Sequence, residues 1–263
     1  MQNGSESKEE PEDRRQRRGI YLLPNLFTTG TLFAGFYAMI ASTQGLYGTA
    51  CVAIFAAMVT DMLDGRIARL TNTQSDFGIQ YDSLADLVAF GLAAALTAYM
   101  YSLQSLGDLS FVAGKIGWLA AFFYTACAAL RLARFNIQRG GPSESKVFFG
   151  LPSPAAAGLI VGFVWTGTDF GFDGHTLVVP VLLLTIAAGS LMVSNIRFHS
   201  FKDLNISGRV PFTYILILVL GFVLISVDPP RVLFLGFLAY ALSGPGLALW
   251  RWRQRRRAAN QAG

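Results

Sequence analysis

The sequence is short of charge: only 14% of its 263 residues are Asp, Glu, Lys or Arg, whereas 53% are hydrophobic. Soluble domains carry about 25% charged residues, so this chain lacks the polar surface that a water-soluble fold requires. Apolar runs cover almost everything from residue 22 to residue 250. A single membrane domain is therefore the simplest interpretation.

Cysteine and histidine are scarce as well, with two of each. Cys51 and Cys127 lie inside apolar runs, where we expect small buried side chains rather than a disulfide or a metal site. His175 and His199 have no partner that the sequence identifies, so both are expected at the surface. These numbers argue against a metal site built from thiolates or imidazoles.

The apolar runs predict an all-α integral membrane protein. A spanning helix needs about 20 mostly apolar residues, and the runs are continuous rather than alternating. Turn-forming clusters such as Asp228-Pro229-Pro230 separate them. About eight transmembrane helices are predicted, at 22–43, 47–69, 78–102, 114–136, 151–168, 175–193, 211–227 and 231–250.

Three regions follow from these spans: a polar tail at 1–20, one transmembrane catalytic domain at 21–250 and a basic tail at 251–263. The first twenty residues have too little apolar content to fold alone, so we expect a solvated tail. No cleavable signal peptide is evident in them. Asn25 and Thr28 are expected to cap or line the start of the first span, with capping favoured.

Basic residues predict the orientation. With eight spans, nineteen of the 21 Lys and Arg residues lie on the side of both tails, and only Lys115 and Arg231 lie on the other. Cytoplasmic loops are rich in Lys and Arg, so both tails and the loops after the second, fourth and sixth spans should be cytoplasmic, in the inner membrane. The net charge of +5 thus reflects membrane orientation rather than nucleic-acid binding.

Four carboxylates fall within 26 residues, at the end of the second span and the start of the third. Asp61 and Asp64 are three apart and Asp82 and Asp86 are four apart, so each pair shares a helix face. Carboxylates inside a membrane are costly and usually functional. Their mutual repulsion calls for hard cations, which favours two Mg²⁺ or Mn²⁺ ions bound by all four aspartates.

The residues around these acids fit an approaching phosphate ligand. Gly65 leaves room beside Asp64, and Ala68 keeps the next turn small. Arg66 and Arg69 offer guanidinium groups to phosphate or to a carboxylate. Gly78 is expected to let the second and third spans pack closely. Snorkelling acids paired with the two arginines are the alternative, although two cations cannot neutralise four acids.

The pattern Asp61-x2-Asp64-Gly65-x2-Ala68-Arg69-x8-Gly78-x3-Asp82-x3-Asp86 resembles, without a gap, the signature of the CDP-alcohol phosphatidyltransferases. The resemblance implies a six-helix core, a homodimer and two divalent ions. It implies CDP binding by Asp61, Asp64, Gly65, Ala68, Arg69, Gly78 and Asp82. It also implies that the first three aspartates are chiefly metal ligands and that Asp86 is the catalytic base.

Weaker motifs resemble the bacterial phosphatidylserine synthase branch of that family. They are Leu23-Pro24-Asn25-Leu26-Phe27-Thr28, the stretch 69–75, Ala133-Arg134-Phe135-Asn136 and the stretch 149–157. This branch implies CDP-diacylglycerol and L-serine as substrates, among membrane lipids. Arg131, Arg134 and Asn136 are then candidates for the acceptor pocket, because arginine binds a carboxylate in a bidentate way. Binding of lipid phosphate by these arginines is equally open.

Three rival functions remain. Glycerol phosphate, inositol phosphate or choline could replace serine as acceptor, with Arg131, Arg134, Arg139 and Lys146 available for a phosphate. An ion-coupled transporter would also place aspartates in the membrane, but would not need the glycines at these spacings. A membrane prenyltransferase normally carries its Asp-rich motifs far apart in the sequence.

The charge asymmetry makes a topological prediction. In intact cells, a cysteine introduced near Asp173 should react with an impermeant thiol reagent, whereas one near Ser143 should not. Tags at either terminus should be protected in the same cells. The reverse labelling pattern would contradict the eight-span arrangement.

Overall fold

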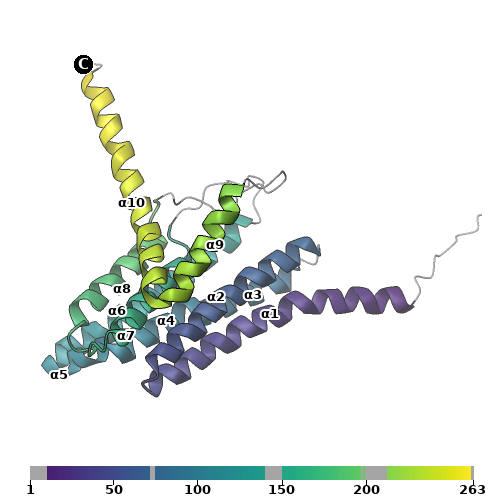
Figure 1. The fold of residues 1–263 in the computed structure, drawn as a ribbon, viewed down its shortest axis with the longest axis horizontal. Helices are drawn as coiled ribbons and strands as arrows, with labels where there is room; N and C mark the ends of the chain where they lie inside the picture. The colour runs from purple at the N-terminus through teal and green to yellow at the C-terminus, as the bar shows by residue number, and fades with distance from the viewer. Residues whose placement is uncertain (1–10, 72–74, 140–149, 197, 199–211, 262–263) are drawn as a thin grey trace, which may run out of the picture.

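The computed structural model describes residues 11–71, 75–139, 150–196, 198 and 212–261. Within these ranges the chain is helical, with no β-strand (Figure 1). In chain order the elements are α1 (Pro11–Thr43), α2 (Tyr47–Leu70), α3 (Asp76–Asp86), the π-helix η1 (Leu87–Leu92), α4 (Ala93–Tyr101), the 3₁₀ turn η2 (Leu103–Ser105), α5 (Leu106–Leu109), α6 (Phe111–Arg139), α7 (Ser153–Asp169), α8 (Val178–Val193), α9 (Phe212–Val227) and α10 (Pro229–Gln261).

Each predicted apolar range contains helix in the described part of the chain, although α7 begins only at Ser153 and α8 only at Val178, and the helices at the two ends run further than expected. The part of the tail that the structure describes is helical from Pro11 onward, where a solvated tail was expected. Proline suits the first position of a helix, and the Glu, Arg and Gln residues after it are good helix formers. At the other end, α10 continues to Gln261 through the arginine-rich segment.

Four helical segments in the described part of the chain are long and apolar enough to cross a membrane: Asn25–Thr43, Asp76–Tyr101, Phe111–Ile137 and Pro229–Arg251. Helix α8 is equally apolar but shorter. Helices α7 and α9 have 17 and 16 residues, below the usual spanning length of about 20. A multi-pass membrane protein is confirmed, whereas the number of eight spans stays a prediction.

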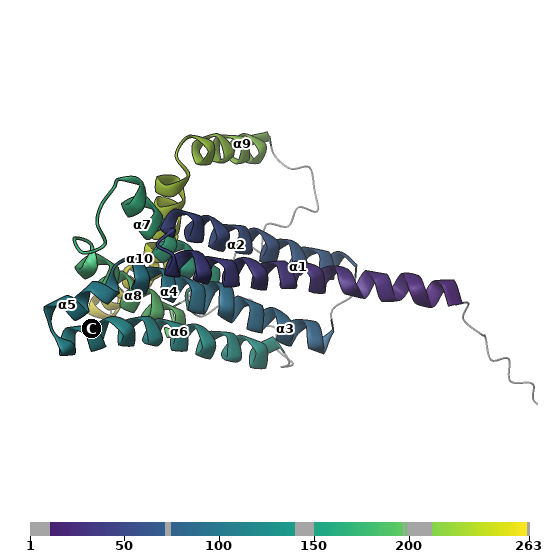
Figure 2. The same ribbon diagram turned by 90° about the horizontal axis from the view of Figure 1, so that it is seen from below.

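The outside of the bundle carries large apolar side chains that water would not tolerate in such numbers. They occur on helices along the whole chain and include Phe33, Phe36, Trp118, Phe122, Leu183 and Phe222, each exposed by 49% or more. Helix α9 lies against α10 and apart from the α1–α2 pair (Figure 2). These surfaces suit contact with lipid chains.

Small residues fill the interior where the helices meet. Helices α1 and α2, the span made of α3 and α4, and helix α6 run alongside one another (Figure 2), and fully buried alanines such as Ala38, Ala57 and Ala93 lie in the interior. At Gly35 helix α1 approaches the backbone of η1 closely, because a Cβ there would lie 2.6 Å from the Cα of Ala89. Close approach through small residues is the usual way that helices associate in membranes.

The third span is not a regular helix. Helices α3 and α4 are joined by the π-helix η1, which begins directly after Asp86. The hydroxyl of Tyr124, fully buried on α6, donates a hydrogen bond of 2.9 Å to the carbonyl oxygen of Phe90 within η1. Single π-turns inside α-helices are rare and often occur at functional sites. The position of η1 directly after Asp86 makes the region around Asp86 a candidate functional site.

A substitution at Gly35 tests the close packing of α1 on η1. Gly35→Ala should lower the free energy of unfolding by about 1–3 kcal/mol, because the added Cβ must push the Ala89 backbone away. Gly48→Ala is the control, since a Cβ at Gly48 meets no atom within 4 Å. Thermal unfolding in detergent micelles compares the two, and equal midpoints would disprove the tight contact.

Candidate active site

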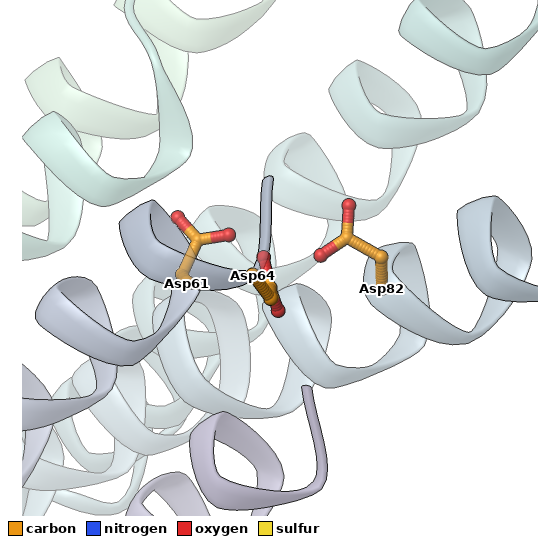
Figure 3. Close-up of side chains that lie close together, drawn as sticks. All are labelled: Asp61, Asp64 and Asp82. Atoms are coloured by element: carbon orange, nitrogen blue, oxygen red, sulfur yellow. The ribbon is translucent and has the colours of Figure 1, made fainter. Parts of the chain in front are cut away.

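Three carboxylates converge between α2 and α3. Each of Asp61, Asp64 and Asp82 offers an oxygen atom, and these oxygens all lie within 4.8 Å of one another. Figure 3 shows the two α2 aspartates and the α3 aspartate side by side. Asp64 is buried, with 4% of its surface exposed, while the other two are half-buried. The helix spacing predicted from the sequence therefore places these three acids in one cluster.

Helix α1 completes the cluster from the side. The hydroxyl of Thr28, itself buried, donates a hydrogen bond of 2.9 Å to Oδ2 of Asp64. The sequence favoured Asn25 and Thr28 as helix caps, which is wrong, because α1 begins at Pro11 and both residues lie well inside it. The role of Thr28 was missed because a threonine in an apolar helix gives no sign of a partner 36 residues away.

Asp86 lies one helical turn beyond Asp82, outside the set of three. Its carboxyl group interacts with that of Asp61 and, at longer range, with Asp82 and with the guanidinium of Arg131 on α6. Its Oδ1 is sealed from solvent and has no hydrogen-bond partner among the described atoms. A buried acceptor without a partner is costly. A proton, a cation or a substrate hydroxyl would satisfy it.

The alternative of snorkelling acids requires ion pairs between the two arginines and the cluster, and among the described side chains Arg66 does not form one. Arg66 is exposed, and no ion pair joins it to Asp61 or Asp64 in the described part of the chain. The side chain of Arg69 lies outside the described residues, so its predicted role in CDP binding stays a prediction. Of the two predicted partners, Arg66 therefore does not offset the charge of Asp61 and Asp64.

The glycines around the cluster differ in what they face. A Cβ at Gly65 would meet no atom within 4 Å, so the backbone beside Asp64 borders open space, and Ala68 one turn on is half-buried. A Cβ at Gly78 would lie 3.1 Å from Ser75 Oγ and 3.5 Å from Asn25 Oδ1. The closer contact is with Ser75, the N-cap of α3 itself, and the contact with Asn25 brings α1 to ordinary contact distance, whereas the sequence placed Gly78 against the second span.

The predicted acceptor residues at the end of α6 contact three different elements. Arg131 Nη1 donates to Ser153 Oγ on α7 at 2.6 Å, and Arg134 Nη2 donates to Asn195 Oδ1 beyond α8 at 3.1 Å. Asn136 Nδ2 donates to Ser83 Oγ on α3 at 2.9 Å. Asn136 thereby links α6 to the turn between Asp82 and Asp86. The two arginines, three residues apart, have different partners.

The chemistry of the three-carboxylate cluster fits a divalent metal. Its donors are oxygens alone, which hard cations such as Mg²⁺ and Mn²⁺ prefer. The open side at Gly65 would admit a phosphate ligand next to such an ion. Asp61, Asp64 and Asp82 are the residues that would hold it. Without a cation, the repulsion between three close carboxylates would be left uncompensated.

A cavity of about 580 Å³ lies far from the carboxylates, at the end of the bundle that holds the loop after α7. Tyr47, Tyr101, Asp108, Asp173 and His175 are among its lining residues. Its acidic and imidazole groups are mainly exposed: His175 and Asp108, 3.9 Å apart, keep 61% and 74% of their side-chain surface. This cavity offers no cluster comparable to the three aspartates.

Comparison with known proteins agrees with the site. The family described as CDP-alcohol phosphatidyltransferase matches residues 21–190, which include all four aspartates. The chain is similar to the CDP-diacylglycerol–serine O-phosphatidyltransferase of Helicobacter pylori, with 39% identity over 205 residues, 78% of this chain and 83% of the relative.

Proteins of the same name from two other organisms are also similar. The relative from Bacillus subtilis is 35% identical over 182 residues, covering 68% of this chain and 91% of its own length. The one from Methanocaldococcus jannaschii is 32% identical over 186 residues, covering 71% and 78%. With the family signature, the carboxylate cluster and these relatives in agreement, the chain belongs to the CDP-alcohol phosphatidyltransferase family, whose members depend on divalent metal ions.

Proposed function

We propose that this protein transfers the phosphatidyl group of CDP-diacylglycerol to the hydroxyl of L-serine, releasing CMP and phosphatidylserine. The observation that carries the proposal is the cluster of Asp61, Asp64 and Asp82 with Asp86 beside it. Relatives that carry the serine O-phosphatidyltransferase name and align over most of the chain support serine as the acceptor. The protein is thus an enzyme of phospholipid synthesis.

The proposal includes the membrane arrangement. Eight helices cross the inner membrane, six of them forming the catalytic core, and two copies form a homodimer. The aspartates and both tails face the cytoplasm, where serine and the CDP headgroup are available. The excess of Lys and Arg on that side supports this orientation.

Asp61, Asp64 and Asp82 hold the divalent ions, two in number, with Asp86 as a further ligand. When bound, the ions supply positive charge that offsets the pyrophosphate and the charge developing on the leaving group. The CDP group lies along the stretch from Asp61 to Arg69, beside Gly65. The pyrophosphate reaches the aspartates from this side, and the acyl chains extend into the lipid around the bundle.

Asp86 is the proton acceptor. Its buried Oδ1, which has no hydrogen-bond partner among the described atoms, can accept a hydrogen bond from the serine hydroxyl. The hydroxyl oxygen attacks the phosphorus that carries the diacylglycerol, its proton moves to Asp86, and the bond between this phosphorus and the CMP oxygen breaks. CMP leaves with the electron pair of that bond. A single displacement of this kind needs no covalent enzyme intermediate.

The acceptor site is assigned to the cytoplasmic end of α6, near Arg131, Arg134 and Asn136. Arg134 is the residue proposed for the serine carboxylate, because it is exposed near the end of the helix that faces the cluster. Glycerol phosphate, inositol phosphate or choline are the competing acceptors. Purified protein given CDP-diacylglycerol, metal and each alcohol in turn, with CMP release as the measurement, distinguishes them. CMP release with serine alone would establish the acceptor.

Substitution of different aspartates should affect binding and turnover differently. Asp64→Asn should abolish both activity and metal-dependent CDP binding, because it weakens the metal site. Asp86→Asn should lower kcat by about 10²- to 10⁴-fold, the usual worth of a general base, and still bind CDP. Calorimetry and CMP release measure the two effects, with the distant Asp108→Asn as control. Loss of CDP binding in Asp86→Asn would make Asp86 chiefly a ligand.

The acceptor assignment predicts a selective effect at Arg134. Lysine there keeps the charge but loses the planar guanidinium group. We therefore expect kcat/KM for serine to fall roughly five- to hundredfold, which corresponds to about 1–3 kcal/mol of lost binding energy. The KM for CDP-diacylglycerol should stay within twofold. Ethanolamine, which lacks the carboxylate, should be a poor acceptor for the unmodified enzyme. Equal use of serine and ethanolamine would show that the carboxylate is not recognised.

A further inference from the structure

Helix α1 carries three threonines at the level of the carboxylate cluster: Thr28, Thr29 and Thr31. A threonine inside a helix usually bonds to a carbonyl group of the preceding turn of its own helix. Here the hydroxyl of each of the three also reaches a side chain on another helix, either α2 or α3. These partners lie at, or directly before, the three clustered aspartates.

Thr28 contacts the most buried of these aspartates directly. Its hydroxyl donates the hydrogen bond of 2.9 Å to Asp64 Oδ2, and both residues are only 4% exposed. A hydrogen bond to one carboxylate oxygen limits the rotation of the group and so directs its second oxygen. Residues that bond to metal ligands in this way are typically worth 10- to 100-fold in metal affinity.

Thr31, one turn further along α1, bonds to the residue that precedes Asp61. The hydroxyls of Thr31 and Thr60 are 2.8 Å apart, and Thr31 is 1% exposed. Because Thr28 and Thr31 are three residues apart, they lie on the same face of α1 and both reach α2. The α2 turn from Asp61 to Asp64 is thus fixed to α1 at its two ends.

Thr29 reaches the other acid-bearing helix. Its hydroxyl lies 3.0 Å from that of Tyr81, the residue before Asp82, and also donates to the carbonyl oxygen of Asn25 at 2.7 Å. Successive residues of a helix are about 100° apart around its axis, so Thr28 and Thr29 reach different neighbours. Helix α1 packs against both α2 and α3, which makes these two directions available.

We propose that these three threonines position the metal ligands. Thr28 holds Asp64 directly, and the other two hold the residues before Asp61 and Asp82. The inference rests on the proposed function, in which these aspartates bind divalent ions. The close spacing of the three carboxylates (Figure 3) then depends on α1, a helix that supplies none of them. The threonines are positioning residues, since they act on the ion through the aspartates.

Binding of Mn²⁺ to the full-length protein in detergent micelles, measured by calorimetry, tests the proposal. Thr28→Val removes the hydroxyl and keeps the branched shape, so the Mn²⁺ dissociation constant should rise about 10- to 100-fold. Thr28→Ser keeps the hydroxyl and should bind Mn²⁺ nearly as well as the unmodified protein. Thr31→Val should weaken Mn²⁺ binding about threefold, the usual worth of one hydrogen bond between membrane helices.

The matched control is Thr97→Val. The hydroxyl of Thr97, fully buried on α4, also shares a hydrogen bond of 2.8 Å with α1, through Ser42. At 1.5 Å per residue, Ser42 lies about 21 Å along the helix axis from Thr28. The control therefore loses an equally buried bond between helices and should keep its Mn²⁺ affinity. Equal Mn²⁺ affinities of Thr28→Val and Thr97→Val would overturn the proposal.

Turnover separates positioning from loss of structure. Raising the Mn²⁺ concentration should restore CMP release by Thr28→Val, because its defect lies in metal affinity. A loss of CMP release that saturating Mn²⁺ does not repair would reject the positioning role. If thermal unfolding shows that Thr28→Val does not fold, Thr31→Val decides instead, since it leaves the bond to Asp64 intact. Unchanged Mn²⁺ affinity in Thr31→Val would then reject the proposal.

The proposed function and the positioning role fail in different ways. If Asp64→Asn bound Mn²⁺ as tightly as the unmodified protein, the aspartates would not hold the ion and both proposals would fall. Loss of Mn²⁺ binding in Asp64→Asn but not in Thr28→Val would keep the metal site and reject the role of the threonines. CMP release only with an alcohol other than serine would refute the proposed acceptor, while Mn²⁺ binding would still decide what the threonines do.

Discussion

The structure depends on holding several negative charges close together at the edge of a hydrocarbon layer. Asp61, Asp64 and Asp82 lie within 4.8 Å of one another, and Asp86 adds a fourth acid beside them. Among the described side chains, Arg66 is exposed and forms no ion pair with Asp61 or Asp64, while Arg131 interacts more strongly with Asp86 than with Asp61. Divalent ions together with a phosphate substrate would complement such a cluster of acids.

The rest of the fold keeps this cluster in place. Helices α1, α2 and α3 meet through small residues, so their backbones approach closely and their polar side chains are held in register. Thr28 fixes Asp64 from α1, and Asn136 fixes the turn that carries Asp82 and Asp86 from α6. Two neighbouring helices therefore contribute hydrogen-bonding side chains to the acid-bearing helices. The apolar outer faces, in contact with lipid, leave the interior to these few polar bonds.

The sequence predicted the helices and the acidic cluster well, because both follow from local rules. Apolar run length locates the helices, and spacings of three and four residues place acids on one face. The sequence did not predict the contacts between distant segments. These are the hydrogen bond from Thr28 to Asp64, the contact of Gly78 with Asn25 on α1, and the separate partners of Arg131 and Arg134. The π-helix was also missed, since no residue pattern in 87–92 distinguishes a wider turn from a regular one.

That wider turn divides one span into two independently oriented halves. An extra residue in a helix rotates everything after it by about 100° relative to everything before it. Residues ahead of η1 can therefore present Asp82 and Asp86 to the polar end, while those behind it present Ala93, Ala94 and Thr97 to the packed interior. A regular α-helix would fix the side-chain directions of both halves relative to each other. The π-helix therefore lets the carboxylates before it and the packed alanines after it take side-chain directions that do not depend on each other.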